Sequence, residues 1–119
     1  MSITFEAATI PNMNPGETGY KLSTGDLAAV RFKKGEHAAP HMFSWKATAR
    51  AVDAAGKPIL NSEGQPIVVH IHAGCPKMSL IDGSTNPAAI KQEALNAVLT
   101  NEDGLAAECA AERAYLSQP

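Results

Sequence analysis

The feature that most constrains the fold of this chain is a strict alternation of side chains over residues 41–52. An antiparallel strand with one buried face and one wet face alternates in this way, because successive side chains point to opposite sides of the sheet. The pattern therefore predicts a long, half-buried strand. Its buried side would carry His41, Phe43, Trp45, Ala47, Ala49 and Ala51, and its polar side Met42, Ser44, Lys46, Thr48, Arg50 and Val52.

Further segments with a period of two surround this strand. We expect strands at residues 2–9, 20–22, 27–34 and 67–73, separated by Pro-rich and Gly-rich breaks. Pro removes a hydrogen-bond donor from a strand, so the sequence Gly74-Cys75-Pro76 should kink or bulge the last strand, which would then continue through Met78, Leu80 and Ile81. We expect no internal repeat and no low-complexity tract.

After Gly83 the period changes from two to that of a helix. Asn86 is a good N-cap, and Pro87 suits the first helical position. Residues 100–104 interrupt the pattern before a second, Ala-rich helical stretch with a weak apolar face, which runs from 105 to 116. The apolar face of the first helix would be Ile90, Ala94, Leu95, Val98 and Leu99.

Strands followed by helices predict an α+β fold. The length of 119 residues suits one domain, with a sheet region at 1–83 and a helical region at 84–119. Aromatic residues are 5% of the chain, so the core is thin. A thin core favours completion of the fold by a second copy, although the two helices could equally cover their own sheet.

The charge is divided along the chain. Residues 21–50 carry six basic and two acidic side chains, whereas residues 82–119 carry two basic and six acidic ones. A basic segment beside an acidic one indicates a polyanionic partner for one part of the molecule, the simpler interpretation being solvated faces of both signs.

Several classes of protein are not expected. No stretch approaches the ~20 apolar residues of a membrane span, and the N-terminus lacks the pattern of a secretory signal. The two cysteines, Cys75 and Cys109, are too few for a disulfide scaffold. The motifs of common nucleophilic and nucleotide-dependent enzymes do not occur, so we expect no catalytic residues and no cofactor.

The polar sides of three predicted strands supply the candidate binding residues. If these strands pair, their cations and hydroxyls form one lattice suited to phosphates and to the bases of RNA loops. The expected RNA-binding residues are Arg31, Lys33, Ser44, Lys46, Thr48, Arg50, His70 and His72.

The histidines permit a different interpretation. His70 and His72 point the same way from one strand, and His37, His41 or Cys75 could complete a zinc site for a small metal-binding domain or enzyme. A dimeric module without an RNA role is a third possibility.

This layout resembles the coat proteins of single-stranded RNA bacteriophages. The resemblance rests on residues 84–99 and 101–104 as the first helix and the break after it, and on the alternating Ser44-x-Lys46-x-Thr48-x-Arg50. Residues 53–65 would match the loop around the symmetry axes of the shell, and residues 67–81 the last and longest strand.

The resemblance implies an N-terminal hairpin, an antiparallel sheet and two C-terminal helices that pack on the partner subunit of an intertwined homodimer. It also implies that dimers tile an icosahedral shell whose inner sheet face binds genomic RNA. Such a protein would be part of a virion assembled in the cytoplasm of a bacterial host, without a membrane partner.

Overall fold

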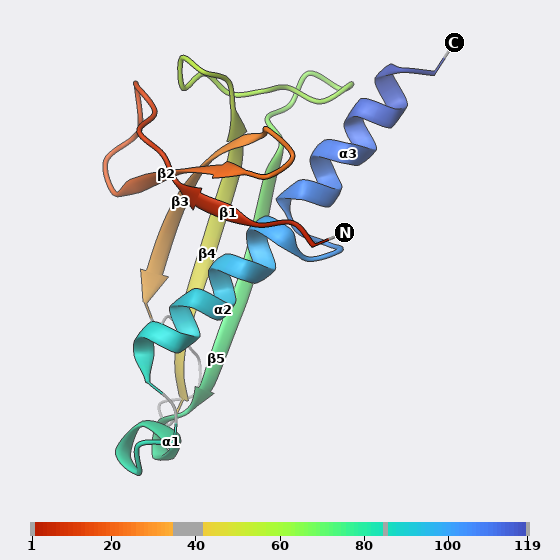
Figure 1. Ribbon diagram of the computed structural model, residues 1–119. Helices are drawn as coiled ribbons and strands as arrows, with labels where there is room; N and C mark the ends of the chain where they lie inside the picture. The colour runs from red at the N-terminus through yellow and green to blue at the C-terminus, as the bar shows by residue number, and fades with distance from the viewer. Residues whose placement is uncertain (1, 35–41, 85, 119) are drawn as a thin grey trace.

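Five antiparallel strands form one sheet in which the spatial order equals the sequence order. The structure, a computed structural model, describes residues 2–34, 42–84 and 86–118. Each strand pairs with the next one along the chain, so the connections are hairpins or loops and the N-terminal hairpin is present (Figure 1). The predicted α+β class is confirmed. The strands are β1 (Phe5–Ala7), β2 (Glu17–Leu22), β3 (Leu27–Lys34), β4 (Met42–Val52) and β5 (Val68–Pro76).

In the described part of the chain, the last strand is followed by the helices α1 (Lys77–Ile81), α2 (Pro87–Thr100) and α3 (Leu105–Leu116). The predicted kink in β5 is wrong, because β4 and β5 pair in an unbroken register from Arg50–Val68 to Met42–Pro76. The predicted continuation of the strand through residue 81 is also wrong. Pro76 cannot donate to a further ladder bond, and the chain turns into the short helix α1 directly after it. The longest strand is therefore β4, with 11 residues.

Helix α2 begins and packs as its sequence predicts. The Asn86 side chain accepts a hydrogen bond of 2.7 Å from the backbone N–H of Ala89, and Pro87 occupies the first turn. This cap satisfies one of the N–H groups that a helix start leaves without an intrahelical partner. The buried residues of α2 are the five expected ones, Ile90, Ala94, Leu95, Val98 and Leu99.

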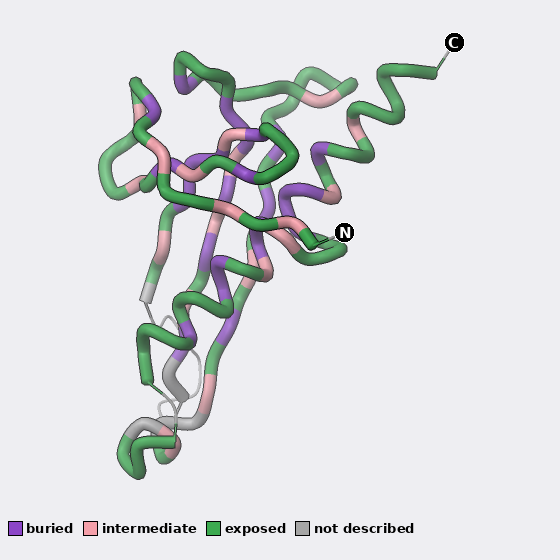
Figure 2. Tube along the Cα trace, viewed as in Figure 1, coloured by how far each residue is buried: buried purple, intermediate pink, exposed green. Residues whose placement is uncertain are grey.

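The helices cover one face of the sheet, which we call the helix face. Helix α2 packs chiefly on β4 and β5, and its buried side shares one core with Ala47, Ala49 and Ala51, each exposed by 1% or less. The buried segments of β4, β5 and α2 lie against one another in Figure 2. Since alanine side chains are short, they form a flat floor on which a helix can lie close to the strand.

Helix α3 is buried in its first half and exposed in its second. Leu105, Ala106 and Cys109 belong to the core, whereas Tyr115 and Leu116 are 58% and 65% exposed. An ion pair joins Arg113 to the buried carboxylate of Asp26, which follows β2, and so fixes the helix to the sheet. The predicted apolar face of this helix therefore ends before Leu116.

The opposite face of the sheet carries a second, smaller core. Ile10, Ala29 and Val52 are buried there, and Met13 and Leu27 pack against them. The segment before β2 crosses the strands at this end so closely that a Cβ on Gly19 would lie 2.5 Å from the carbonyl oxygen of Ala8. The part of this face that the segment before β2 does not cover is called the open face.

The loop between β4 and β5 consists of two turns with the same construction. Asp53 accepts hydrogen bonds from the backbone N–H groups of residues 55 and 57, and Asn61 accepts them from residues 63 and 65. A glycine with positive φ follows three residues after each, at Gly56 and Gly64. These turns correspond to a short repeat in the sequence, Asp/Asn-x-x-Gly-x-Pro-Ile at 53–59 and 61–67, so the expectation that the chain has no internal repeat is wrong.

Candidate nucleic-acid interface

The three strands expected to form a polar lattice are direct neighbours in the structure. One row across the open face runs Glu17, Arg31, Thr48 and His70, each residue opposite the next on the adjoining strand. The parallel row beside it runs Lys33, Lys46 and His72. The continuous lattice that the alternation predicted is therefore present, because the register of β3, β4 and β5 aligns their polar positions.

The second row brings basic side chains together. Lys33 lies directly opposite Lys46, and Lys46 lies directly opposite His72. All three residues are exposed. Lys33 and Lys46 therefore concentrate positive charge at this point of the open face.

A hydrogen bond joins β4 to β5 beside this row. Thr48 Oγ1 lies 3.0 Å from His70 Nδ1, and the tautomer of the imidazole decides which group donates. Lys46, Thr48, His70 and His72 line a shallow groove of about 250 Å³. The groove thus brings together an ammonium group, a hydroxyl and two imidazoles from the neighbouring strands β4 and β5.

Arg50 has a carboxylate partner that the sequence interpretation did not consider. Its Nε and Nη2 groups each donate a hydrogen bond of 2.9 Å to Glu17, one to each carboxylate oxygen. The side chains are 16% and 6% exposed, respectively. The hydrogen bonds from Arg50 lower the pKa of the Glu17 carboxyl against the opposing effect of burial, and the same bonds raise the pKa of Arg50.

Arg31 is exposed. Its Nη2 donates a hydrogen bond of 3.0 Å to the carbonyl oxygen of Pro15, in the loop before β2. Together with Glu17, Thr48 and Arg50 it lines a second hollow of about 280 Å³. The two hollows adjoin at Thr48, which lines both.

Ser44, one of the predicted RNA contacts, is buried. The residue is 0% exposed, and its hydroxyl has no hydrogen-bond partner among the residues that the structure describes. The alternation assigned its side of the strand, but a serine side chain is short and exposure depends on what lies above it, which alternation does not encode. Ser44 is therefore not available to a ligand of the open face.

The alternative metal site gains no support from the described residues. Among them, no group of three or more His, Cys, Asp or Glu side chains is arranged to hold an ion. Cys75 packs against the helix-face core, on the side of β5 opposite His70 and His72. His37 and His41, the other proposed ligands, lie outside the described residues.

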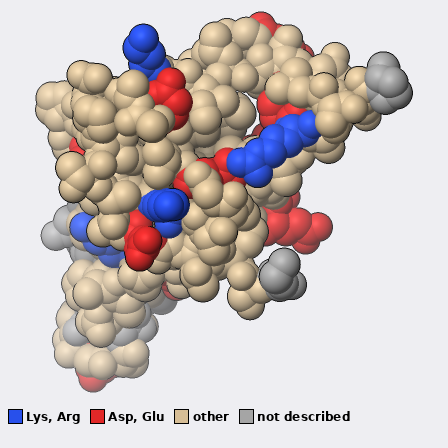
Figure 3. Space-filling model, turned by 45° about the horizontal axis from the view of Figure 1, so that its top comes forward, with Lys and Arg blue, Asp and Glu red and all other residues tan. Residues whose placement is uncertain are grey.

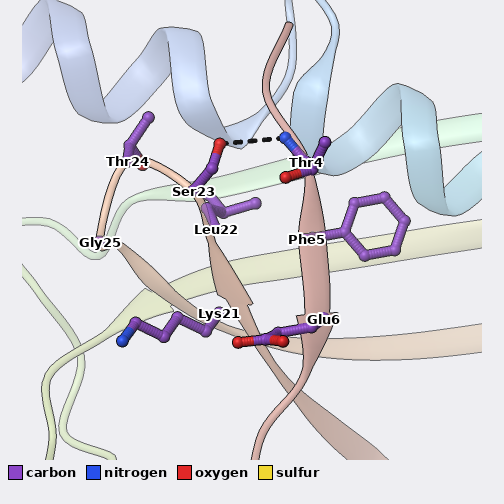
Figure 4. Close-up of a pocket in the computed structure, with 8 residues that line it drawn as sticks. All are labelled: Thr4, Phe5, Glu6, Lys21, Leu22, Ser23, Thr24 and Gly25. Carbon is purple, nitrogen blue, oxygen red and sulfur yellow. Dashed lines mark hydrogen bonds between the residues drawn. The ribbon is translucent and has the colours of Figure 1, made fainter.

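A larger hollow of about 490 Å³ lies away from this lattice, between β1 and the turn after β2. Figure 4 shows its wall, where the backbone N–H of Thr4 donates to Ser23 Oγ and the Lys21 ammonium points away from Glu6. It is lined mainly by one hairpin and its turn, and it gathers no cluster of functional groups comparable to the lattice.

On the side of the molecule visible in Figure 3, basic and acidic side chains lie next to one another. Among the described residues, no helix has the length and apolar character needed to cross a membrane. Neither family models, nor curated proteins, nor solved structures give a match to this chain.

Glu17 is the residue of this site that sequence reasoning missed. It opens β2, and its row on the sheet becomes visible only once β2 is paired with β3. The signal in the sequence was weak, since a single acidic residue after Asn14-Pro15-Gly16 is typical of a turn.

Proposed function

We propose that this chain is a coat protein of the single-stranded RNA bacteriophage type, which binds RNA through its open face. The observation that carries the proposal is the row of Lys33, Lys46 and His72 beside the hydrogen-bonded Thr48 and His70. Ammonium groups suit phosphates, and hydroxyls and imidazoles suit sugars and bases. Two lysines in one row concentrate positive charge on this face, which supports a polyanionic ligand.

The division of charge supports this arrangement. The segment at 82–119, with its excess of acidic residues, covers the helix face, and the basic lattice lies on the opposite face. RNA on the open face is thus separated from the acidic helices by the thickness of the sheet. In a closed shell, the open face would point inward to the genome.

A second copy of the chain completes this proposal. Among the described strands β5 is the last in the sheet order, so its outer edge is a candidate for antiparallel pairing across a twofold axis. Apolar side chains at the end of α3 and in the loop before β5 are exposed and would be covered by the partner. They are Ile59, Leu60, Tyr115 and Leu116. In the single chain α2 packs on its own sheet, and packing on the partner's sheet belongs to the proposal.

The decisive experiment is the size and nucleic-acid content of the purified protein, read on one sizing column before and after nuclease treatment. A coat protein is expected to elute as a large particle whose RNA resists nuclease. A small monomer free of nucleic acid would refute the proposal.

The lattice itself is tested by Lys46→Ala, with Lys57→Ala in the loop after β4 as the control of equal charge change. Loss of one phosphate contact lowers the slope of log affinity for single-stranded RNA against log salt by about 0.7. We expect this reduction for Lys46→Ala and not for Lys57→Ala. Equal slopes for the two variants would place the RNA elsewhere on the molecule.

A further inference from the structure

We propose that Glu17 acts as an internal anion that masks Arg50, and so sets the number of positive charges that the open face offers to a polyanion. The inference rests on the proposed function, since it concerns the same face. According to this inference, Arg50 is not one of the phosphate contacts that the strand alternation predicts. The acidic residue Glu17 influences binding because it neutralises Arg50.

The geometry of the pair is that of anion recognition. Arg50 presents two parallel N–H groups to the two oxygens of Glu17, at 2.9 Å each. Arginine binds phosphate oxygens with the same bidentate fork. Glu17 therefore occupies the edge of the guanidinium that a phosphate would use.

The carboxylate is held in place from its other side. The backbone N–H of Asn14 donates a hydrogen bond of 2.8 Å to Glu17 Oε1, the oxygen that also accepts from Arg50 Nη2. The same loop accepts the hydrogen bond from Arg31 through the carbonyl of Pro15. The loop before β2 thus holds Glu17 over β3 and β4. The folded chain itself therefore positions the carboxylate that masks Arg50.

The two side chains neutralise each other where solvent screens them little. Glu17 is 6% exposed and Arg50 is 16% exposed, whereas Lys46 in the neighbouring row is exposed. A polyanion that approaches the face meets Lys46 as an available charge and meets Arg50 as half of a neutral pair. Removing the negative charge from Glu17 should therefore add one cation to the binding surface.

The test is Glu17→Gln, which keeps the size of the side chain and its ability to accept from Arg50. The control is Glu63→Gln, which makes the same change of net charge in the exposed turn at 61–64. The probe is a short single-stranded oligouridylate, titrated against wild type and both variants between about 50 mM and 200 mM salt.

We expect Glu17→Gln to steepen the salt slope by about 0.7, which raises the ratio of its affinities at the two salt concentrations about 2.6-fold. Glu63→Gln should keep the wild-type slope. If Glu17→Gln and Glu63→Gln have the same slope, the mask does not exist.

A double variant gives an independent answer and guards against misfolding of the single one. Glu17→Gln combined with Arg50→Gln removes the ion pair without changing the net charge. If Arg50 is masked, the double variant keeps the wild-type slope. A slope lower by about 0.7 would show that Arg50 contacts phosphate and would overturn the inference. Failure of the wild type to bind the oligouridylate would instead refute the proposed function, and the inference with it.

Discussion

The pair of Glu17 and Arg50 also makes a strong prediction for stability. Arg50→Ala would leave a carboxylate that is 6% exposed without the guanidinium that neutralises it. At the Nε–Oε2 distance of 2.9 Å, an effective dielectric constant of about 20 gives a gross attraction of about 6 kcal/mol. Desolvation of both groups opposes this attraction. Since breaking a buried pair from one side costs about 3–5 kcal/mol, we expect a loss of that size in the free energy of unfolding.

The loss should depend on pH in a defined direction. Because Arg50 lowers the pKa of Glu17 in the folded state, the stability contributed by the pair is present above the pKa of glutamate in the unfolded chain. It is lost as the pH falls through the lower pKa of the folded state. In acid, a proton also neutralises the carboxylate that Arg50→Ala leaves behind. The difference between wild type and variant should therefore be largest near neutral pH and shrink on acidification.

Urea unfolding measures both effects through the fluorescence of Trp45, the only tryptophan of the chain. Its ring packs edge-on against Phe32 at 6.3 Å between centroids, so its signal reports the packing on the helix face. Arg31→Ala is the matched control, since Arg31 is exposed and makes one backbone contact, which is worth less than about 1.5 kcal/mol. A loss below about 1 kcal/mol for Arg50→Ala at neutral pH, or a loss that stays constant in acid, would refute the reasoning.

Three further predictions concern local features of the fold. Asn86→Ala should lower the urea midpoint by the equivalent of about 1 kcal/mol without changing the m-value. An unchanged midpoint would show that the Asn86 cap does not stabilise the protein. Gly56 and Gly64 both have positive φ. A Cβ added at Gly56 would lie 1.8 Å from a backbone oxygen, whereas a Cβ added at Gly64 would lie in open space. Alanine at Gly64 should cost about 1–2 kcal/mol and alanine at Gly56 clearly more, so equal losses would count against this packing. Burial raises the pKa of Cys109 to about 11, so in a Cys75→Ser variant about one thiol in a thousand is ionised at about pH 8. Alkylation should then be very slow, and rapid labelling of the folded protein would contradict it.

The sequence predicted the parts of the fold that depend on short-range periodicity. Alternation located β3 and β4 almost to the residue, since each strand has one dry face and one wet face. The N-cap at Asn86 and the helical spacing from Ile90 to Leu99 located α2 for the same local reasons. These elements need no knowledge of the rest of the chain.

The errors arise where tertiary context decides. Met78 and Ile81 were assigned to a strand, but a short apolar run has no distinctive period, and α1 leaves them 69% and 79% exposed. The alternation places Ser44 on the correct side of β4, but it does not predict that this side chain is buried. Glu17 joined the site through the pairing of β2 with β3, which brings residues far apart in the sequence into contact.

Strand β4 couples folding to the proposed binding function more tightly than any other element. Its alanines form the floor under α2, and the residues between them, Lys46, Thr48 and Arg50, form the middle of the open face. A shift of its register by one residue would exchange the two sets, because the side-chain period of a strand is two. It would bring a lysine and an arginine beneath α2, where their charges would lose water without gaining partners. These charges thus disfavour the wrong register, and Lys46 is also available to a polyanion, so the strict alternation of this strand serves folding and binding together.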